Sequence, residues 1–424
     1  MAVNDNGGSI LNTDLLVVGG GIAGVTAAVE AAEAGKEVVL IEKEHWLGGR
    51  VVQMHRYFPK LCPPVCGLEI NFRRIRQNPM IKVFTGATAS KIEGGPGEYK
   101  ASINVEPRYV NENCTACGEC EKACEVEVAN RFDFGMSKAK AIRLPHEMCY
   151  PYRYFIDAEA VKDPKMQNIA DVCEYKAIDL NMTPETLEIN AKAVIWATGW
   201  EPYDANKLDN LSFGKLPAVV TNMMLERMAS VNGPSKGKIS RPVDGNPITK
   251  AAFVQCAGSR DENHLPYCSA ICCMASLKHS RYIREQYPDA EIHIFFIDAR
   301  TPGRWEDFYQ DVQADPKTII HRGKVARIEQ ADNGMVTLTA ENTLTGSLEH
   351  VTVDLAVLAT GMVPNSKATP PPLGAKQDEF GFIENNGNAS VIGAGVTAGP
   401  KDVAGTNEEA TGAVIRALQT MVRK

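Results

Sequence analysis

The segment from residue 13 to residue 42 constrains the fold more than any other part of the sequence. An apolar strand pattern over 13–18 runs into Gly19-Gly20-Gly21-Ile22-Ala23-Gly24, and an alanine-rich helix pattern follows over 25–34. A second strand pattern, 37–41, ends at Glu42, which lies 23 residues after Gly19. Glycines at this GxGxxG spacing allow a tight turn, so that a pyrophosphate can approach the helix N-terminus. Glu42 is placed to accept hydrogen bonds from ribose hydroxyls, and we predict an α/β dinucleotide-binding domain.

The residues that follow favour FAD over NAD as the dinucleotide. Gly48-Gly49-Arg50 resembles the second phosphate-contacting turn of FAD-dependent reductases, and Ala197-Thr198-Gly199 is echoed by a turn that ends in Gly361. A late Gly393-Ala394-Gly395 precedes a helix expected from about residue 407, whose N-terminus can stabilise an anionic reduced flavin. The predicted FAD-binding residues are Gly19, Gly21, Ile22, Ala23, Gly24, Glu42, Lys43, Gly48, Gly49, Arg50, Ala197, Thr198, Gly199, Gly361, Gly393 and Gly395.

A first group of cysteines has the spacing of an iron–sulfur site. The sequence has 12 cysteines, of which Cys114, Cys117, Cys120 and Cys124 follow the ferredoxin pattern, with Glu125 where proline is usual. Cys173 begins a segment that resembles the closing part of a ferredoxin motif. We therefore predict one [4Fe–4S] cluster held by Cys114, Cys117, Cys120 and Cys173. A redox dithiol or a zinc site is the alternative, and Cys124 and Cys149 are left unassigned or form part of a divergent second site.

A second group of cysteines replaces an expected glycine loop. A second strand–helix–strand pattern covers 251–297, but its first strand enters Cys256-Ala257-Gly258-Ser259-Arg260 in place of a glycine-rich turn. Cys268, Cys272 and Cys273 fall around the start of the helix. We expect this domain to keep a NAD-type fold, to have lost NAD binding, and to hold a metal cluster on Cys256, Cys268, Cys272 and Cys273. The alternative is a set of small buried cysteines with one reactive thiol.

Two further cysteines, Cys62 and Cys66, flank Pro63-Pro64-Val65. They form a candidate redox pair or additional ligands near the flavin, although the spacing differs from the CxxC redox motif. No Ser/His/Asp set and no general-base histidine stands out, so the catalytic residues are otherwise unassigned.

These patterns predict a two-dinucleotide-binding-domain flavoprotein of the thioredoxin-reductase type with an inserted ferredoxin-like iron–sulfur domain. The expected division gives the FAD-binding domain three separate stretches, one inserted domain and one degenerate NAD-type domain that carries a cysteine cluster. In chain order the boundaries are 1–106 (FAD), 107–183 (insert), 184–245 (FAD), 246–345 (NAD-type) and 346–424 (FAD).

The charge and the apolar runs exclude two classes of partner. The formal net charge is −7, so no basic surplus is available for nucleic-acid phosphates. Residues 1–8 carry no export pattern, and no run approaches the roughly 18 apolar residues of a membrane helix. We expect a cytoplasmic protein that touches the inner membrane only through partner subunits.

Several motifs together resemble those of heterodisulfide reductase, in its flavin-binding A subunit. They are Gln255-Cys256-Ala257-Gly258-Ser259-Arg260, Tyr267-Cys268-Ser269, Cys272-Cys273-Met274, Ile297-Asp298-Ala299-Arg300-Thr301 and Gly399-Pro400-Lys401-Asp402. The resemblance runs from Asp14 to the final helix and implies electron transfer between FAD and one or two [4Fe–4S] clusters. Longer members of this family have an extra N-terminal domain and a C-terminal ferredoxin module, and this sequence shows neither. In this respect it is similar to the A subunit of the quinone-interacting membrane-bound oxidoreductase complex of sulfate reducers.

That similarity implies a relay of electrons between menaquinone and adenylylsulfate reductase in dissimilatory sulfate reduction. The implied partners are adenylylsulfate reductase itself, a membrane haem subunit, and a second subunit with flavin and iron–sulfur centres. Three alternatives stay open: an electron-bifurcating subunit of the heterodisulfide-reductase kind, a free-standing NAD(P)H-dependent flavin reductase, and a scaffold whose FAD is structural.

Overall fold

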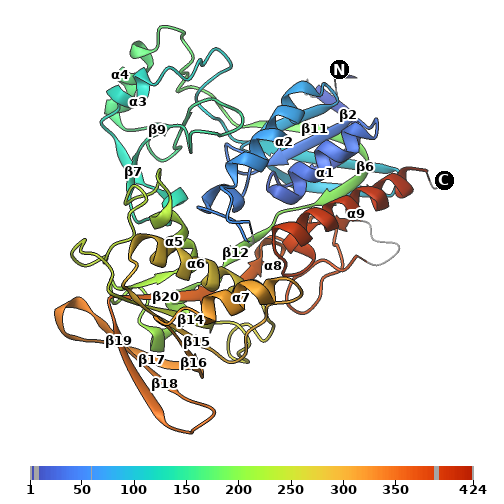
Figure 1. Cartoon of the computed structure of the whole chain (residues 1–424). Helices are drawn as coiled ribbons and strands as arrows, with labels where there is room; N and C mark the ends of the chain where they lie inside the picture. The colour runs from blue at the N-terminus through green and yellow to red at the C-terminus, as the bar shows by residue number, and fades with distance from the viewer. Residues whose placement is uncertain (1, 4–8, 59, 386–390, 423–424) are drawn as a thin grey trace. The chain divides into compact units, whose positions relative to one another are not determined.

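A computed structural model describes residues 2–3, 9–58, 60–385 and 391–422 of the chain. The chain forms two compact units (Figure 1). The first comprises 1–52, 65–200 and 364–424, and the second comprises 53–64 and 201–363. The five-part division expected from the sequence is finer than these two units and stays a prediction.

The first unit contains most of the predicted FAD-binding residues. Its helices and longer strands are β1 (Ala2–Val3), β2 (Ser9–Val18), α1 (Ile22–Glu33), β3 (Val38–Glu42), α2 (Val65–Gln77), β4 (Ile81–Thr85), β5 (Ala87–Gly95), β6 (Glu98–Val105), β11 (Glu185–Trp196), α8 (Asn365–Ala368), β22 (Ile392–Gly393) and α9 (Val403–Val422). Residues 106–184 add α3 (Glu119–Ala123), β7 (Glu127–Ala129), β8 (Lys138–Lys140), β9 (Ile142–Arg143), β10 (Phe155–Ile156) and α4 (Pro164–Val172).

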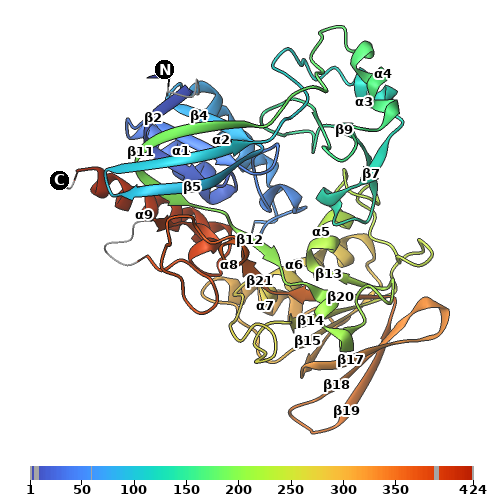
Figure 2. The ribbon, with the colours of Figure 1, turned by 180° about the vertical axis from the view of Figure 1, so that it is seen from behind.

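The central sheet of the first unit has the order β4-β3-β2-β11-β6-β5, with β22 beside β11. Strands β4, β3, β2 and β11 are parallel, and β3 is buried along its whole length, as expected for a strand covered on both faces. Helices α1 and α9 lie side by side on one face of this sheet (Figure 1), and the strands lie in front of them when the unit is seen from behind (Figure 2). The C-terminal ends of β2, β3 and β11 therefore meet at one edge, where α1 begins.

The predicted insert leaves and rejoins the sheet at one place. The end of β6 pairs with the start of β11, Val105 opposite Glu185, so residues 106–184 form an excursion between paired strand ends. The excursion has an apolar core of its own, which includes Ile142, Ile156 and Met166. Its two short hairpins and two short helices are consistent with a small domain that is held by few secondary-structure hydrogen bonds.

The second unit repeats the parallel α/β pattern with a smaller sheet. Its elements are β13 (Val219–Thr221), α5 (Asn222–Ala229), β14 (Lys250–Ala257), α6 (Cys272–Gln286), β15 (Glu291–Phe296), α7 (Trp305–Gln313), β16 (Thr318–Arg322), β17 (Val325–Gln330), β18 (Val336–Glu341), β19 (Leu348–Val353) and β20 (Leu355–Thr360). The parallel sheet has the order β13-β20-β14-β15-β16, and β17-β18-β19 form a separate antiparallel sheet. Two strands lie at the boundaries of the units, β12 (Trp200–Pro202) and β21 (Met362–Pro364).

The predicted α/β class is confirmed, but some helices and strands begin at other residues than the sequence predicts. The final helix begins at Val403, not near residue 407, because Asp402 accepts a hydrogen bond from the Gly405 amide (2.8 Å) and so caps an earlier turn. The sequence also predicts a strand over 389–392; residues 389 and 390 lie outside the described residues, and Ile392 begins β22.

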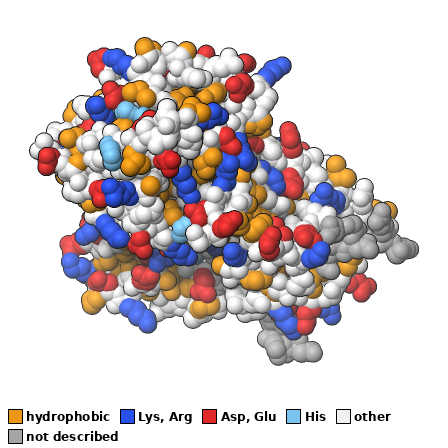
Figure 3. Space-filling view, turned by 90° about the horizontal axis from the view of Figure 1, so that it is seen from below, with side chains coloured by type: hydrophobic (Ala, Val, Ile, Leu, Met, Phe, Trp, Pro, Cys, Tyr) orange, Lys and Arg blue, Asp and Glu red, His pale blue; other side chains and the backbone are white. Residues whose placement is uncertain are grey.

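Among the described residues, no helix combines the length and the apolar character needed to cross a membrane. On the face that Figure 3 presents, acidic and basic side chains are interspersed.

Candidate functional site

The glycine loop between β2 and α1 is built for close approach of backbone atoms. Gly19 has φ +108°, and a Cβ there would lie 2.3 Å from the Ala197 carbonyl oxygen. A Cβ on Gly24 would lie 1.7 Å from the Gly19 carbonyl oxygen. Only glycine fits these two positions, which lets Ile22 and Ala23 start α1 with their amides at the C-terminal edge of the sheet.

The second predicted phosphate turn packs directly on the first. Gly48 donates its amide hydrogen to the Gly20 carbonyl oxygen (2.8 Å), and Gly21 and Gly48 form a parallel bridge. A Cβ on Gly49 would lie 2.9 Å from the Gly21 Cα. The structure therefore brings the residues of both predicted FAD turns together in one loop pair.

Glu42 lies at the end of β3 with its side chain held under the glycine loop. Its carboxylate accepts hydrogen bonds from the amides of Gly20 (2.5 Å) and Glu44 (2.8 Å). Burial raises the pKa of Glu42 to about 7, and these two amides oppose the shift. A buried carboxylate with unused lone pairs is suited to accept hydroxyl donors from a ribose.

The turn after β11 and the segment after β22 complete this edge. The Gly199 amide donates to Thr397 Oγ1 (2.9 Å), and a Cβ on Gly395 would lie 2.8 Å from the Ala23 Cβ. The Thr198 hydroxyl is buried and has no hydrogen-bond partner among the described residues. Because buried polar atoms are rarely left unpaired, this orphan hydroxyl fits a site that a polar ligand such as FAD completes.

The remaining predicted FAD residues are placed less uniformly. Arg50 donates from Nε to the Trp200 carbonyl oxygen (3.2 Å), and burial lowers its pKa to about 10. Lys43 is exposed directly after Glu42. Gly361 lies in the second unit, where a Cβ would lie 2.3 Å from Ser259 Oγ and 2.7 Å from Ser269 Oγ. Its predicted flavin role stays untested.

The insert brings its four predicted cluster ligands together. Cys120 interacts electrostatically with Cys114, Cys117 and Cys173. Left-handed backbone at Ala116 (φ 56°) and at Lys176 (φ 50°) bends the chain beside the ligands. The Cys173 sulfur accepts a hydrogen bond from the Ala177 amide (3.4 Å).

The second group of cysteines gathers at the end of β14 and the start of α6. Cys272 interacts electrostatically with Cys256, Cys268 and Cys273. A bulge between Val254 and Ala257, with Cys256 at φ 54°, turns the Cys256 side chain out of the strand pattern. The Cys268 sulfur accepts a hydrogen bond from the Ala270 amide (3.3 Å). Ala270 also has left-handed backbone, with φ 62°. These sparsely populated conformations of residues other than glycine concentrate around the four thiols.

Burial hinders the ionisation of one thiol in the first group, Cys120, and of three in the second, Cys256, Cys272 and Cys273, because it raises their pKa values. Burial raises the pKa of Cys120 to about 12 and that of Cys256 to about 11, and the neighbouring thiols add to both shifts. Burial also raises the pKa of Cys272 well above the usual value. Thiolate ligands gathered in this way need a cationic centre to neutralise them.

Within the described ranges, no group of three or more His, Cys, Asp or Glu side chains is arranged to hold one metal ion. A [4Fe–4S] cube takes one thiolate at each of four irons, so its ligands stand farther apart than those of a single ion. The metal content of both groups stays a prediction.

The other four cysteines have different surroundings. Cys124 and Cys149 are buried in the first unit, where Cys124 packs on Met166 (3.9 Å). Cys62 is half-buried in the second unit, and Cys66 is exposed in α2 of the first. Their predicted pairing stays untested.

Sequence reasoning assigned no role to the charged residues beside the second cysteine group. Arg260 binds Asp298 through two hydrogen bonds (2.6 and 3.1 Å), and Arg300 Nε donates to the same carboxylate (3.3 Å). Arg260, Cys268 and Arg300 also line a pocket of about 350 Å³. Only Arg260, four positions after Cys256, carried a sequence signal, because Asp298 and Arg300 lie 25 or more positions from any cysteine.

Known proteins match this chain in sequence and in fold. The family model for FAD-dependent oxidoreductases matches residues 14–200. The chain is 36% identical over 359 residues to the A subunit of the ferredoxin/F420H2-dependent CoB-CoM heterodisulfide reductase of Methanosarcina acetivorans, and the match covers 84% of this chain and 45% of the relative. It is 32% identical over 422 residues to the A subunit of the H2:CoB-CoM heterodisulfide,ferredoxin reductase of Methanothermobacter marburgensis, with 96% of this chain and 64% of the relative covered. The chain thus spans about half to two thirds of the length of these relatives.

Solved structures show the same fold at low sequence identity. The thioredoxin reductase of T. acidophilum matches with a TM-score of 0.52 at 14% identity, covering 97% of both chains. The thioredoxin reductase of Lactococcus lactis matches with a TM-score of 0.52 at 13% identity, covering 97% of this chain and 99% of the other. Residues 14–200 therefore match the FAD-dependent oxidoreductase family, the chain has the fold of the thioredoxin reductases, and most of its length is similar to the A subunit of heterodisulfide reductase.

Proposed function

We propose that this flavoprotein is an electron-transfer subunit that carries FAD and two [4Fe–4S] clusters. The single observation that supports this most is the presence of two groups of four interacting thiols, one in each unit, in a chain that also has a complete FAD loop pair. FAD can exchange either one or two electrons at a time, whereas a cluster exchanges one. Together they can couple a two-electron reaction to one-electron transfer.

In this proposal each group of residues has one task. Gly19, Gly21, Gly24 and the turn at Gly48 and Gly49 bind the pyrophosphate, and Glu42 accepts the ribose hydroxyls. Cys114, Cys117, Cys120 and Cys173 hold one cluster, and Cys256, Cys268, Cys272 and Cys273 hold the other. Backbone amides at Ala177 and Ala270 donate to two of these sulfurs and stabilise their thiolate form.

The similarities favour the heterodisulfide-reductase alternative over the predicted sulfate-reduction role. The two relatives are named for heterodisulfide reduction with ferredoxin, F420H2 or H2, and neither name mentions menaquinone or adenylylsulfate reductase. We infer that the chain works inside a multi-subunit complex and exchanges electrons with low-potential carriers there. Electron bifurcation, contact with the membrane through a partner, and a haem subunit stay predictions.

The free-standing NAD(P)H reductase receives less support from the second unit. Where a glycine loop would follow the strand, β14 ends in a bulge at Cys256, and Cys272 and Cys273 occupy the first positions of α6. The pyrophosphate of a nicotinamide cofactor would need to approach the backbone amides at the start of this helix. The residues at these positions are cysteines, whose side chains replace the glycines that allow such an approach.

Anaerobic purification with iron and flavin analysis tests the proposal. We expect about eight irons per FAD and two EPR signals in a redox titration. Cys120→Ala and Cys268→Ala should each remove about four irons and one signal, a different signal in each variant. Cys124→Ala is the matched control, because this buried cysteine lies in the same excursion as Cys120 and should leave both signals intact.

Three results would contradict the proposal in different parts. Iron-free protein that retains FAD would exclude both clusters. About four irons per FAD that survive Cys268→Ala would exclude the second cluster alone. Rapid bleaching of the flavin by NAD(P)H would support a free-standing reductase.

A further inference from the structure

The second cysteine group is flanked by two arginines that share one carboxylate. The Arg260 guanidinium hydrogen-bonds the Cys256 sulfur as well as both oxygens of Asp298. On the other side, the Arg300 backbone amide hydrogen-bonds the Cys273 sulfur, and its side chain contacts Asp298. Asp298 is therefore the counter-ion of both cations.

The backbone of this segment fixes the arrangement. The Cys273 thiol lies 3.8 Å from the Asp298 carbonyl oxygen, so the residues that bear these charges are adjacent to the sulfurs themselves. Arg260 has left-handed backbone (φ 53°), and its amide donates to the Tyr267 carbonyl oxygen (3.1 Å), which closes the loop between Cys256 and Cys268. Hydrogen bonds to Asp298 therefore fix the positions of both guanidinium groups near the cysteines.

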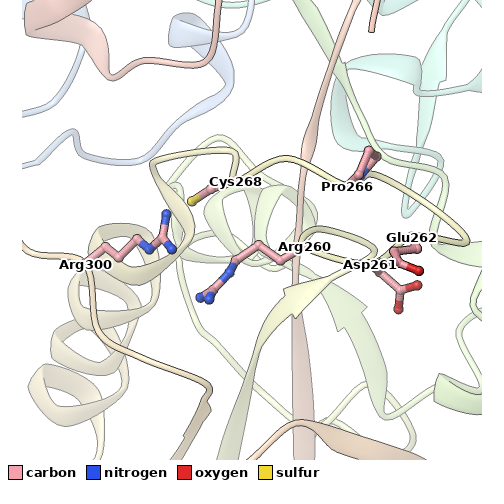
Figure 4. A pocket seen from close by; sticks show the side chains of 6 residues that line it. All are labelled: Arg260, Asp261, Glu262, Pro266, Cys268 and Arg300. Carbon is pink, nitrogen blue, oxygen red and sulfur yellow. The ribbon is translucent and has the colours of Figure 1, made fainter. Parts of the chain in front are cut away.

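Figure 4 shows how these side chains lie around the pocket. Arg260, Arg300 and the Cys268 sulfur lie toward one end, and Asp261 and Glu262 lie toward the other. Asp261 is paired with Lys324, so its charge is already compensated. The two arginines therefore lie at the end of the pocket that holds Cys268.

We propose that Arg260 and Arg300 raise the reduction potential of the cluster held by Cys256, Cys268, Cys272 and Cys273, and that Asp298 moderates their effect. The inference rests on the proposed function, because it requires a cluster on these four cysteines. A cluster with four thiolate ligands is an anion, and its reduction by one electron adds one negative charge. Nearby cations favour the reduced state, and a nearby carboxylate opposes it.

The proposal predicts opposite effects from neighbouring substitutions. Arg260→Gln and Arg300→Gln each remove a cation, so both should lower the potential of this cluster. Asp298→Asn removes the shared anion, so it should raise the potential. At a fixed solution potential we expect the ratio of reduced to oxidised cluster to change by about two- to tenfold in each case, because these groups are only partly shielded from water.

An EPR-monitored redox titration of the anaerobically purified full chain measures these shifts. Sodium dithionite supplies the electrons, and iron per FAD is measured for every variant. Arg327→Gln, an exposed arginine of β17 paired with Glu329, and Asp289→Asn, an exposed aspartate paired with Lys317, are matched controls that should leave the potential unchanged. Arg300→Gln keeps the backbone hydrogen bond to Cys273, so it tests the charge even if Arg260→Gln loses iron.

The outcomes separate this inference from the proposed function. A lower potential in Arg300→Gln and a higher one in Asp298→Asn, with iron retained, support the inference. Unchanged potentials, or shifts of the same sign in both variants, overturn it while the intact cluster signal upholds the proposed function. A wild-type chain without iron at these cysteines overturns both.

Discussion

At the scale of single residues, Glu42 has the clearest expected energetic role in the proposed FAD site. Its buried carboxylate ends β3 under the glycine loop and keeps hydrogen-bonding capacity beyond the Gly20 and Glu44 amides. Hydrogen bonds to a charged group contribute about 1.5–3 kcal/mol. We expect Glu42→Gln to weaken FAD binding by about tenfold or more, measured by flavin fluorescence on titration of the FAD-free protein. Glu93→Gln, an exposed position in β5, is the control and should bind FAD like the wild type.

The raised pKa of Glu42 also predicts a pH dependence. Burial raises the pKa of Glu42 from 4.5 to about 7, so the FAD-free protein loses stability as the pH rises through this interval and the carboxyl ionises. Ribose hydroxyls donate to the ionised form, so FAD binding should weaken as the pH falls below about 7. The dissociation constant of Glu42→Gln should be nearly independent of pH across the same interval. An equal pH dependence in both proteins would show that Glu42 is not the titrating group.

The sequence predicted the residues of this loop because their task is local. Close approach of backbone atoms requires glycine at positions 19 and 24, and Glu42 ends a strand. The spacing of these residues in the sequence is enough to predict both features. The contacts of Arg260 and Arg300 with Asp298 could not be read in the same way. They depend on how a bulged strand and a turn bring Arg260 to a carboxylate 38 positions along the chain, where Arg300 already contacts it.

At the scale of elements, the junction of β2 with α1 depends on the absence of one side chain. A Cβ on Gly24 would lie 1.7 Å from the Gly19 carbonyl oxygen, a distance that requires the strand and the helix to separate. We expect Gly24→Ala to cost about 1–3 kcal/mol of unfolding free energy and to abolish FAD retention. Gly412→Ala in α9 is the control, because its Cβ would meet open space and should add about 0.5–1 kcal/mol. Normal FAD content in Gly24→Ala would refute the close approach.

A buried charge network holds two helices and a loop of the second unit together. The Glu226 carboxylate of α5 accepts hydrogen bonds from Lys278 (2.5 Å) and His279 (2.6 Å) of α6 and from the His55 amide (2.9 Å). Burial alone would raise the pKa of Glu226, but Lys278 and His279 hold it well below its usual value. The network therefore stabilises the fold above the ordinary carboxyl pKa and weakens as the pH falls toward the lowered one.

Removing the carboxylate charge tests this network. Glu226→Gln leaves the Lys278 ammonium buried without a counter-ion, and we expect a loss of about 3–5 kcal/mol in chemical denaturation at neutral pH. Glu285→Gln breaks an exposed pair with Arg56 and should cost at most about 1 kcal/mol. Similar losses in the two variants would mean that the network is not the source of stability.

Helices and strands could be predicted from the sequence where apolar residues recur at a regular spacing within the element itself. The strands and helices of both α/β patterns lie within a few residues of their predicted positions, because apolar periodicity marks them. Helices α2 and α7 were not predicted. Each has a narrow apolar face among many charged residues, and Leu68, Phe72 and Ile75 become a buried stripe only when α2 packs.

At the scale of the whole molecule, the two units have separate cores and separate candidate cofactor sites. The proposed FAD loop pair and the proposed cluster site of residues 114–173 lie in the first unit, and the second cysteine group lies entirely in the second. A ligand that binds only folded protein stabilises the unit that contains its site. Thermal unfolding of the holoprotein should therefore show two transitions, since two cores do not guarantee one cooperative step.

Selective removal of cofactors assigns these transitions. Stripping FAD at high salt should lower one transition, and the remaining transition should move little. Cys268→Ala, which removes only the second cluster, should lower the other. At a free FAD concentration about one hundred times the dissociation constant, the stabilisation of the first unit is about 2.7 kcal/mol, large enough to separate the two transitions by differential scanning calorimetry. A single transition that shifts equally on loss of either cofactor would mean that the units unfold as one, and that the stability of each depends on both cofactors.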